Sequence, residues 1–209
     1  MSMITPAIFH SIFGQDRCHK KGGWFIGDLE FHCFMSLVRF VRPEVMVELG
    51  VFHGATSKAV LDEMPNLKRY MGVDIPFGSK TALPSQSNET PQRPGEEALG
   101  DDRFELVITP TGTTPRLPIA DFVYIDGDHS FDGVMRDTKE AFRVIRPGGC
   151  IMWHDYHTTM CDVTRAIDLL NQIGEDRIIN IESTRLCFTF AGTTLKGALE
   201  GANLKKWIA

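Results

Sequence analysis

The sequence predicts an α/β protein in which a doubly wound, mostly parallel sheet of seven strands is closed by an antiparallel strand. Three observations lead to this fold class. Short apolar runs alternate with segments in which apolar residues recur every three or four positions, the pattern of alternating strands and helices. Several of the apolar runs end in glycine or acidic residues. The last two runs are joined by only four residues, too few for a helical crossover, so we expect an antiparallel pair.

The composition is that of one globular domain. Its 209 residues, 43% hydrophobic and 23% charged, suffice for one α/β core and are few for two. A formal net charge of −5 argues against a nucleic-acid binder that relies on phosphate attraction. No apolar run approaches the roughly 20 residues that cross a bilayer, and we find no export signal. Five cysteines without a CxxC pair fit a reducing compartment, so the expected location is cytoplasmic, without membrane partners.

The chain is expected to begin with an irregular segment, residues 1–28, followed by a single domain, residues 29–209. The first segment is rich in glycine, histidine and aromatic residues, and its Trp24 and Phe25 are candidates for a substrate lid. The domain opens with a helix that ends before Pro43. One stripe of this helix carries Glu30, Cys33, Phe34, Leu37, Val38 and Val41.

The first strand is predicted at residues 45–49. A glycine turn, residues 50–54, leads from it into a helix that Thr56 or Ser57 could cap. Residues 76–102 then break the alternation with proline, serine and glycine, and so long a loop is a second lid candidate. The other strands are expected at residues 70–73, 104–108, 122–125, 150–153, 177–181 and 186–190. Helices are expected over the apolar positions 134–145 and 163–170.

The turn after the first strand suits a cofactor without a diphosphate. It reads Glu48-x-Gly50-x-x-x-Gly54, with Phe52 where the dinucleotide fingerprint has the glycine that lets the backbone approach a pyrophosphate. This disfavours a nucleotide-binding oxidoreductase. Glu48 could meet a cationic amino group, and Asp74 could accept both hydroxyls of a ribose. S-adenosylmethionine therefore fits better, whereas the alternative is that the two glycines form a plain tight turn.

A second group of polar residues follows two later strands. Asp126 ends the fourth strand, and His154 and Asp155 end the fifth. If these strands are neighbours, their tips lie about 5 Å apart, so the three side chains could share one divalent ion. Mg²⁺ or Mn²⁺ would suit this ligand set first, and Fe²⁺ or Zn²⁺ less well. Such an ion would lower the pKa of a substrate hydroxyl, and Asp128 or His129 would take the proton.

These residues also have structural interpretations. Asp126 could position only a loop or the sulfonium group of the cofactor. Asp128, Ser130 or Asp132 could cap the helix that follows. His154 could be a hydrogen-bonded histidine of the core.

Two segments carry a resemblance to a known family. VELGVFHGATS resembles motif I of class I S-adenosylmethionine-dependent methyltransferases. FVYIDGDHSFDGVMRDTKEAFRVIRPGGCIMWHDYH is similar to the small-molecule O-methyltransferase branch with DGDH and PGG…HD elements. The resemblance covers residues 29–190 and implies a Rossmann-like methyltransferase fold. It implies these cofactor contacts: Glu48, Gly50 and Gly54 at the methionine end, Asp74 at the ribose, and Gly112 and Thr113 beside the adenine.

The resemblance implies methyl transfer to a hydroxyl group of a small-molecule acceptor, with assistance from the divalent ion. Metal-dependent members that act on macrolide sugars and catechols have an acid where this chain has His154. A homodimer is a further expectation. Two alternatives stay open at this point: a metal-dependent hydroxylase or oxidation enzyme that holds iron in the histidine and aspartate cluster, and a protein that binds the cofactor without turnover.

Overall fold

The computed structural model describes residues 1–15, 27–79, 93–159, 161–173 and 177–192. Trp24, Phe25 and residues 80–92 of the predicted loop lie outside these ranges, so both lid predictions stay predictions. No helix within the described ranges is long and apolar enough to cross a membrane.

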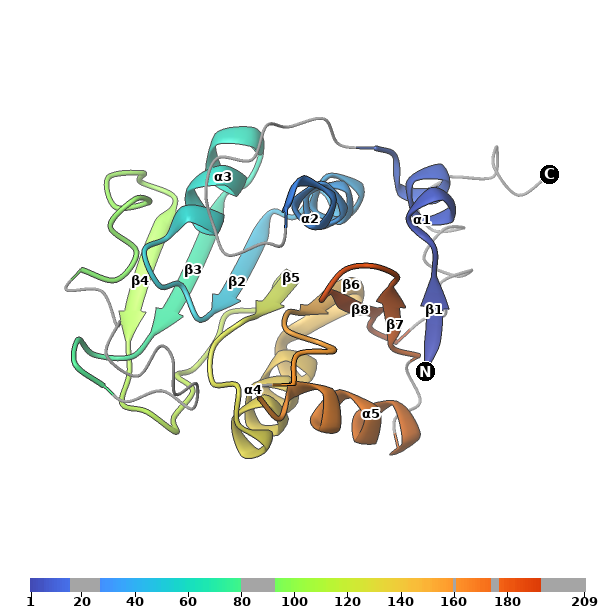
Figure 1. Ribbon diagram of the computed structural model, residues 1–209. Coiled ribbons are helices and arrows are strands. Elements are labelled where there is room, and N and C mark those ends of the chain that lie inside the picture. The colour runs from blue at the N-terminus through green and yellow to red at the C-terminus, as the bar shows by residue number, and fades with distance from the viewer. Residues whose placement is uncertain (16–26, 80–92, 160, 174–176, 193–209) are drawn as a thin grey trace.

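One eight-stranded sheet forms the centre of the molecule, in the order β1-β7-β8-β6-β5-β2-β3-β4 (Figure 1). The strands are β1 (Ser2–Ile4), β2 (Val45–Leu49), β3 (Arg69–Asp74), β4 (Phe104–Ile108), β5 (Ala120–Ile125), β6 (Ile145–Trp153), β7 (Ile179–Ile181) and β8 (Cys187–Phe190). The helices are α1 (Pro6–Phe13), α2 (Gly27–Val41), α3 (Ala55–Glu63), α4 (Phe131–Val144) and α5 (Val163–Ile173).

Helices cover both faces of the sheet, as expected of a doubly wound fold. α1, α2 and α3 lie on one face, and α4 and α5 lie on the other (Figure 1). The two faces have separate hydrophobic cores because side chains alternate along each strand. In β2, Met46 joins the core beneath α1–α3, whereas Val47 and Leu49 join the core against α4 and α5.

The predicted strand directions are confirmed. β2, β3, β4, β5 and β6 pair in parallel, and β8 runs antiparallel to both of its neighbours, β6 and β7. The predicted number of strands was one too low. The eighth strand is β1, which pairs in parallel with β7 at the edge of the sheet.

The start of the chain is more regular than predicted. Residues 1–13 hold both β1 and α1, and are not an irregular segment. Thr5 caps α1, since its hydroxyl accepts the Ile8 N–H at 3.3 Å, and Pro6 occupies the first turn, where its missing N–H costs nothing. A strand of only three residues is too short to show the alternation on which a sequence-based prediction depends.

Two other local predictions were wrong. α3 begins after Gly54, which is its N-cap, and neither Thr56 nor Ser57 caps it. β6 begins at Ile145, a residue that we assigned to the preceding helix, and its register with β5 shifts between Ala120 and Phe122.

The order of the strands places a topological switch point at β2. This strand pairs with β3 on one side and with β5 on the other, so the crevice of the fold lies at the carboxyl ends of β2 and β5. The two turns there are in close contact. A Cβ atom on Gly50, which has a φ of +94°, would lie 2.2 Å from the carbonyl oxygen of Asp126. Only glycine therefore lets these two turns meet.

Candidate active site

Asp74 at the end of β3 anchors the turn that follows β2. One of its carboxylate oxygens accepts the N–H groups of Val51 and Phe52 at 2.9 and 2.5 Å, and the other accepts the N–H of Ile75 at 2.7 Å. Phe52 itself has a left-handed backbone, with a φ of +52°. Burial raises the pKa of Asp74 despite these three hydrogen bonds. The predicted contact with a ribose stays a prediction.

Glu48 lies beneath the turn. Its carboxyl group is 1% exposed and accepts hydrogen bonds from the hydroxyl of Ser57 and, at 2.9 Å, from that of Tyr70. Burial outweighs both bonds and raises the pKa of Glu48 to about 8. In this arrangement the buried carboxyl group joins β2 to α3 and β3, and its predicted contact with a cationic amino group stays a prediction.

The N-terminus of α3 points to the same edge of the sheet. Gly54 supplies no side-chain cap, unlike Thr5 before α1 and Ser130 before α4, so the first N–H groups of α3 can take an anionic ligand. The end of the predicted loop packs against this turn. The N–H groups of Gly95 and Glu97 donate to the carbonyls of Phe52 and His53 at 2.7 and 3.0 Å.

Gly112 and Thr113 lie in an exposed turn after β4. The hydroxyl of Thr113 donates to the carbonyl of Pro110 at 2.6 Å, and the N–H of Thr109 joins the start of the turn to the carbonyl of Asp74 at 2.9 Å. A Cβ on Gly112 would meet no atom of the described residues within 4 Å. The structure thus brings this turn to the edge that carries Asp74.

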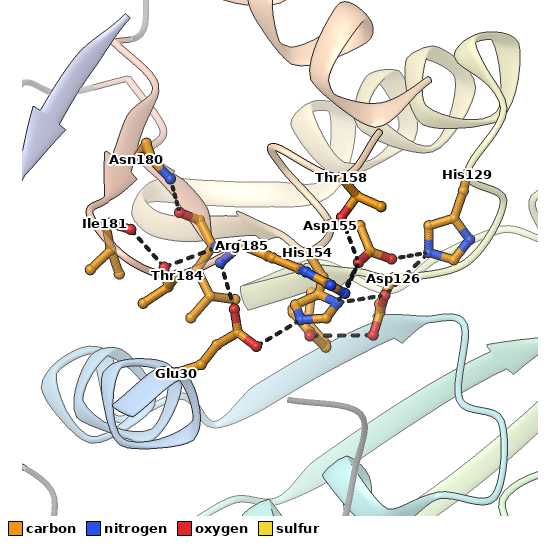
Figure 2. A network of polar contacts seen from close by, with 12 residues as sticks. Glu30, Asp126, His129, His154, Asp155, Thr158, Asn180, Ile181, Thr184 and Arg185 are labelled. Atoms are coloured by element: carbon orange, nitrogen blue, oxygen red, sulfur yellow. Dashed lines mark hydrogen bonds and ion pairs between the residues drawn. The ribbon is translucent and has the colours of Figure 1, made fainter. Parts of the chain in front are cut away.

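The three residues predicted as metal ligands lie together at the tips of β5 and β6. One ligand atom from each of Asp126, His154 and Asp155 can be chosen so that all lie within 4.8 Å of one another. Nδ1 of His154 is 3.3 Å from Oδ1 of Asp126 and 3.7 Å from Oδ1 of Asp155 (Figure 2). Two carboxylates and one imidazole form a donor set that fits Mg²⁺, Mn²⁺ or Fe²⁺.

His129 joins this cluster, whereas Asp128 does not. Nε2 of His129 is 3.0 Å from Asp155 and 3.4 Å from Asp126, and its side chain is 12% exposed. Burial alone would lower the pKa of His129, but the two aspartates raise it to about 9.

Asp128 builds the start of α4. Its carboxylate accepts both the N–H and the hydroxyl of Ser130, at 3.1 and 2.7 Å, and pairs with Arg136 at 3.2 Å. Ser130 in turn caps α4 by accepting the N–H of Gly133 at 3.1 Å. Burial would raise the pKa of Asp128, but these partners hold it below its usual value. Of the candidate caps, Ser130 is the one that the structure assigns.

Opposite charges dominate the electrostatics of the cluster. Burial would raise the pKa of both Asp126 and Asp155, but the neighbouring His154 and His129 lower it. Burial would likewise lower the pKa of His154, but Asp126 and Glu30 raise it well above its usual value. The carboxylates and imidazoles of the cluster therefore each favour the charged form of the other.

Several residues that contact the cluster were not predicted as site residues. Glu30 of α2 lies 3.2 Å from Nε2 of His154, the hydroxyl of Tyr124 donates to Asp126 at 3.3 Å, and Arg185 pairs with Asp155 at 3.2 Å. The sequence held one usable signal: Glu30 is a charged residue on the apolar stripe of a helix. Arg185 lies in the short connector between β7 and β8 and carries no such signal.

Comparisons with known proteins identify a family and a fold. A family model described as a methyltransferase domain, Methyltransf_24, matches residues 47–156. The search of curated proteins found no match. Among solved structures, the cofactor-bound protein Rv0187 from MTB is 14% identical, with 89% of this chain and 87% of that chain covered and a TM-score of 0.56.

Two further solved structures have the same fold. The methyltransferase PaMTH1 of Podospora anserina, bound to SAH, is 12% identical over 78% of this chain and 79% of that one, with a TM-score of 0.55. An O-methyltransferase of Bacillus cereus in complex with SAH is 16% identical over 74% and 77%, with a TM-score of 0.50. At these identities the likeness shows the fold, which confirms the predicted Rossmann-like methyltransferase architecture.

Proposed function

This chain belongs to the Methyltransf_24 family of methyltransferase domains, and from that premise we propose that it methylates a hydroxyl oxygen of a small molecule with S-adenosylmethionine. One observation carries the proposal. The turn after β2 and the cluster after β5 and β6 touch one another, because Gly50 packs against the backbone of Asp126. A methyl donor held by the turn would therefore lie beside the groups that prepare the acceptor.

The donors at the turn fit the cofactor. The uncapped N-terminus of α3 suits the carboxylate of its methionine end, and Asp74 is the acid placed for its ribose. The turn at Gly112 and Thr113 would border the adenine. Glu48 supports this end of β2 by joining it to Ser57 of α3 and to Tyr70 of β3.

The cluster prepares the acceptor. When bound, the cofactor supplies an electrophilic methyl carbon on a positively charged sulfur. A divalent ion held by Asp126, His154 and Asp155 would lower the pKa of the acceptor hydroxyl. An acceptor oxygen prepared in this way would take the methyl group as the carbon–sulfur bond breaks, with S-adenosylhomocysteine as the leaving group.

His129 is the base that the geometry favours for the hydroxyl proton. It lies between Asp126 and Asp155, whereas Asp128, the other candidate, is held by Ser130 and Arg136. Its pKa of about 9 comes from the two aspartates, so a cation on those aspartates would bring the imidazole back toward its neutral form. Neutral imidazole can accept a proton near pH 7.

Oxygen as the accepting atom is supported by the similarity to the Bacillus cereus O-methyltransferase. The free thiols Cys33, Cys150, Cys161 and Cys187 support the cytoplasmic location that we propose. We also propose a homodimer, which light scattering of the purified chain would test.

Incubation with radiolabelled S-adenosylmethionine and a panel of catechols, phenols and sugars would test this function. We expect label transfer that increases with Mg²⁺ or Mn²⁺ and falls with a chelator. Cofactor binding without transfer to any hydroxyl compound would favour a binding protein instead. Co-purified iron with oxygen consumption would favour the hydroxylase alternative.

A further inference from the structure

We propose that Glu30 is a positioning residue that turns the Nδ1 atom of His154 toward Asp126 and Asp155 as a cation ligand. The inference rests on the cation site of the proposed function and deepens it. Glu30 does not itself reach the cation position. It acts through the ring of His154, which lies between Glu30 on one side and the two aspartates on the other (Figure 2).

Two contacts within the described part of the chain orient Glu30. Its Oε2 atom lies 3.2 Å from Nε2 of His154, and its Oε1 atom accepts the backbone N–H of Arg185 at 2.5 Å. The three residues come from α2, the tip of β6 and the connector between β7 and β8, respectively. The carboxylate therefore has a defined orientation toward the imidazole, which a single contact would not give.

The chemistry of the two partners selects the tautomer. A carboxylate only accepts hydrogen bonds, so the Nε2 atom that faces Glu30 carries a proton. Nδ1 is the atom that faces Asp126 and Asp155, and a cation bound to these two carboxylates would take the place of a proton on Nδ1. With Nε2 protonated toward Glu30, the lone pair of Nδ1 would then point at the cation. Histidine ligands of metals commonly donate their second N–H group to a carboxylate in this way.

Burial makes this arrangement costly to disturb. Glu30 and His154 are 1% and 4% exposed, and a buried carboxylate requires partners that replace its water. The position of Glu30 in the first turn of α2 also favours its negative charge through the helix dipole. Glu30 precedes residues 47–156, so this support for the site comes from outside the segment that matches the family model.

A purely structural role for Glu30 is the competing explanation. Its bond to Arg185 joins α2 to the connector between β7 and β8, so its loss could loosen the site without any effect on the tautomer. The two roles differ in one respect. A structural link matters whatever residue occupies position 154, whereas a tautomer-setting carboxylate matters only when a histidine is there.

The test is the affinity of the full chain for Mn²⁺, measured by electron paramagnetic resonance without cofactor or acceptor. Glu30→Gln keeps the shape of the side chain but removes its charge, and we expect binding about 10–100-fold weaker. Glu63→Gln is the matched control. This variant removes a carboxylate of α3 that pairs at 2.7 Å with Arg39 of α2, the helix that carries Glu30, and we expect no change in Mn²⁺ affinity.

A double-mutant cycle separates the two roles. His154→Asp replaces the imidazole by a carboxylate ligand that has no tautomer. On this background Glu30→Gln should leave Mn²⁺ affinity unchanged or raise it, because Glu30 would now repel a nearby acid. An equal loss of affinity on both backgrounds would overturn the inference, and so would an unchanged affinity in the single variant. Circular dichroism of each variant verifies that it is folded.

The outcome can be separated from that of the proposed function. Wild-type protein that binds no Mn²⁺ overturns both the cation site and the role of Glu30. Mn²⁺ binding that depends on Glu30 as described, without methyl transfer to any acceptor, would support this inference and count against the proposed function.

Discussion

Buried carboxylates occupy both halves of the candidate active site at the carboxyl ends of the strands, but their electrostatic environments are opposite. In the half formed by β2 and β3, the pKa values of Glu48 and Asp74 are raised, for Glu48 to about 8. In the half formed by β5 and β6, the pKa values of Asp126 and Asp155 are lowered. All four residues lie within two positions of the carboxyl end of a strand of the same sheet, so their position in the fold does not explain the difference.

The hydrogen-bond and ion-pair partners of the four carboxylates explain why their pKa values shift in opposite directions. Glu48 and Asp74 receive hydrogen bonds from hydroxyl and backbone N–H groups, which carry no full charge, so burial dominates. Asp126 and Asp155 lie beside the imidazoles of His129 and His154, and opposite charge outweighs burial. Neutral hydrogen bonds thus surround the carboxylates of the first half, whereas charged partners surround those of the second half.

The largest effect is expected from Asp126→Asn, which removes a charge at the centre of the second half. Loss of a neighbour that only orients a ligand costs about 10–100-fold, so loss of a ligand itself should lower kcat/KM by more than about a hundredfold. Affinity for S-adenosylhomocysteine, measured by calorimetry, should remain nearly unchanged. Loss of cofactor affinity alone would contradict the role given to Asp126.

The next largest effect is expected from His129→Asn, and Asp128→Asn serves as its comparison. Removal of the favoured base should lower kcat by about 10²–10⁴-fold, the usual contribution of a general base. Asp128→Asn should cost about 0–1 kcal/mol of stability through its pair with Arg136, and should leave kcat nearly intact. The reverse order of the two kcat values would identify Asp128 as the base.

Gly50→Ala tests the contact between the two halves. A left-handed backbone costs a residue with a Cβ about 1–2 kcal/mol, and crowding against the backbone of Asp126 should add about 1–3 kcal/mol. Gly112→Ala is the matched control, since its φ is +81° but its Cβ would meet open space. Urea unfolding should show the smaller loss for Gly112→Ala, and equal losses would mean that the two turns are not in contact.

The most gradual effect is expected from Glu48→Gln as pH changes. The folded-state pKa of Glu48 is about 8 and its ordinary value is 4.5, so the folded protein holds this proton more tightly than the unfolded chain. The contribution of this proton to the free energy of unfolding is complete below about pH 4.5 and is lost as pH rises toward about 8. The free energy of unfolding then falls by up to about 1.4 kcal/mol per pH unit.

The neutral glutamine cannot titrate, so the variant should gain stability relative to wild type across this pH range. Unfolding curves of both proteins, measured in parallel, give the difference directly, because the other titrations largely cancel. A difference that stays constant between pH 4.5 and 8 would show that Glu48 is not perturbed by burial.

Much of the fold was readable from the sequence because its signals are local. The strand from Val45 to Leu49, the glycine turn after it and the antiparallel final pair each follow from patterns within a few residues. β1 was not readable, since three residues carry no period. The N-cap at Gly54 was missed because Ser57, the better capping residue by type, is used by Glu48 instead.

For the site, the sequence alone determined that Asp126 follows one apolar run and that His154 and Asp155 follow another. The structure showed that these two runs form the neighbouring strands β5 and β6. Only the tertiary structure decided their partners. Glu30 is 124 positions from His154 and Arg185 is 155 positions from Glu30, so no local pattern links them. Packing of α2 and of the connector after β7 onto one strand tip creates these contacts, and with them the charges of the site.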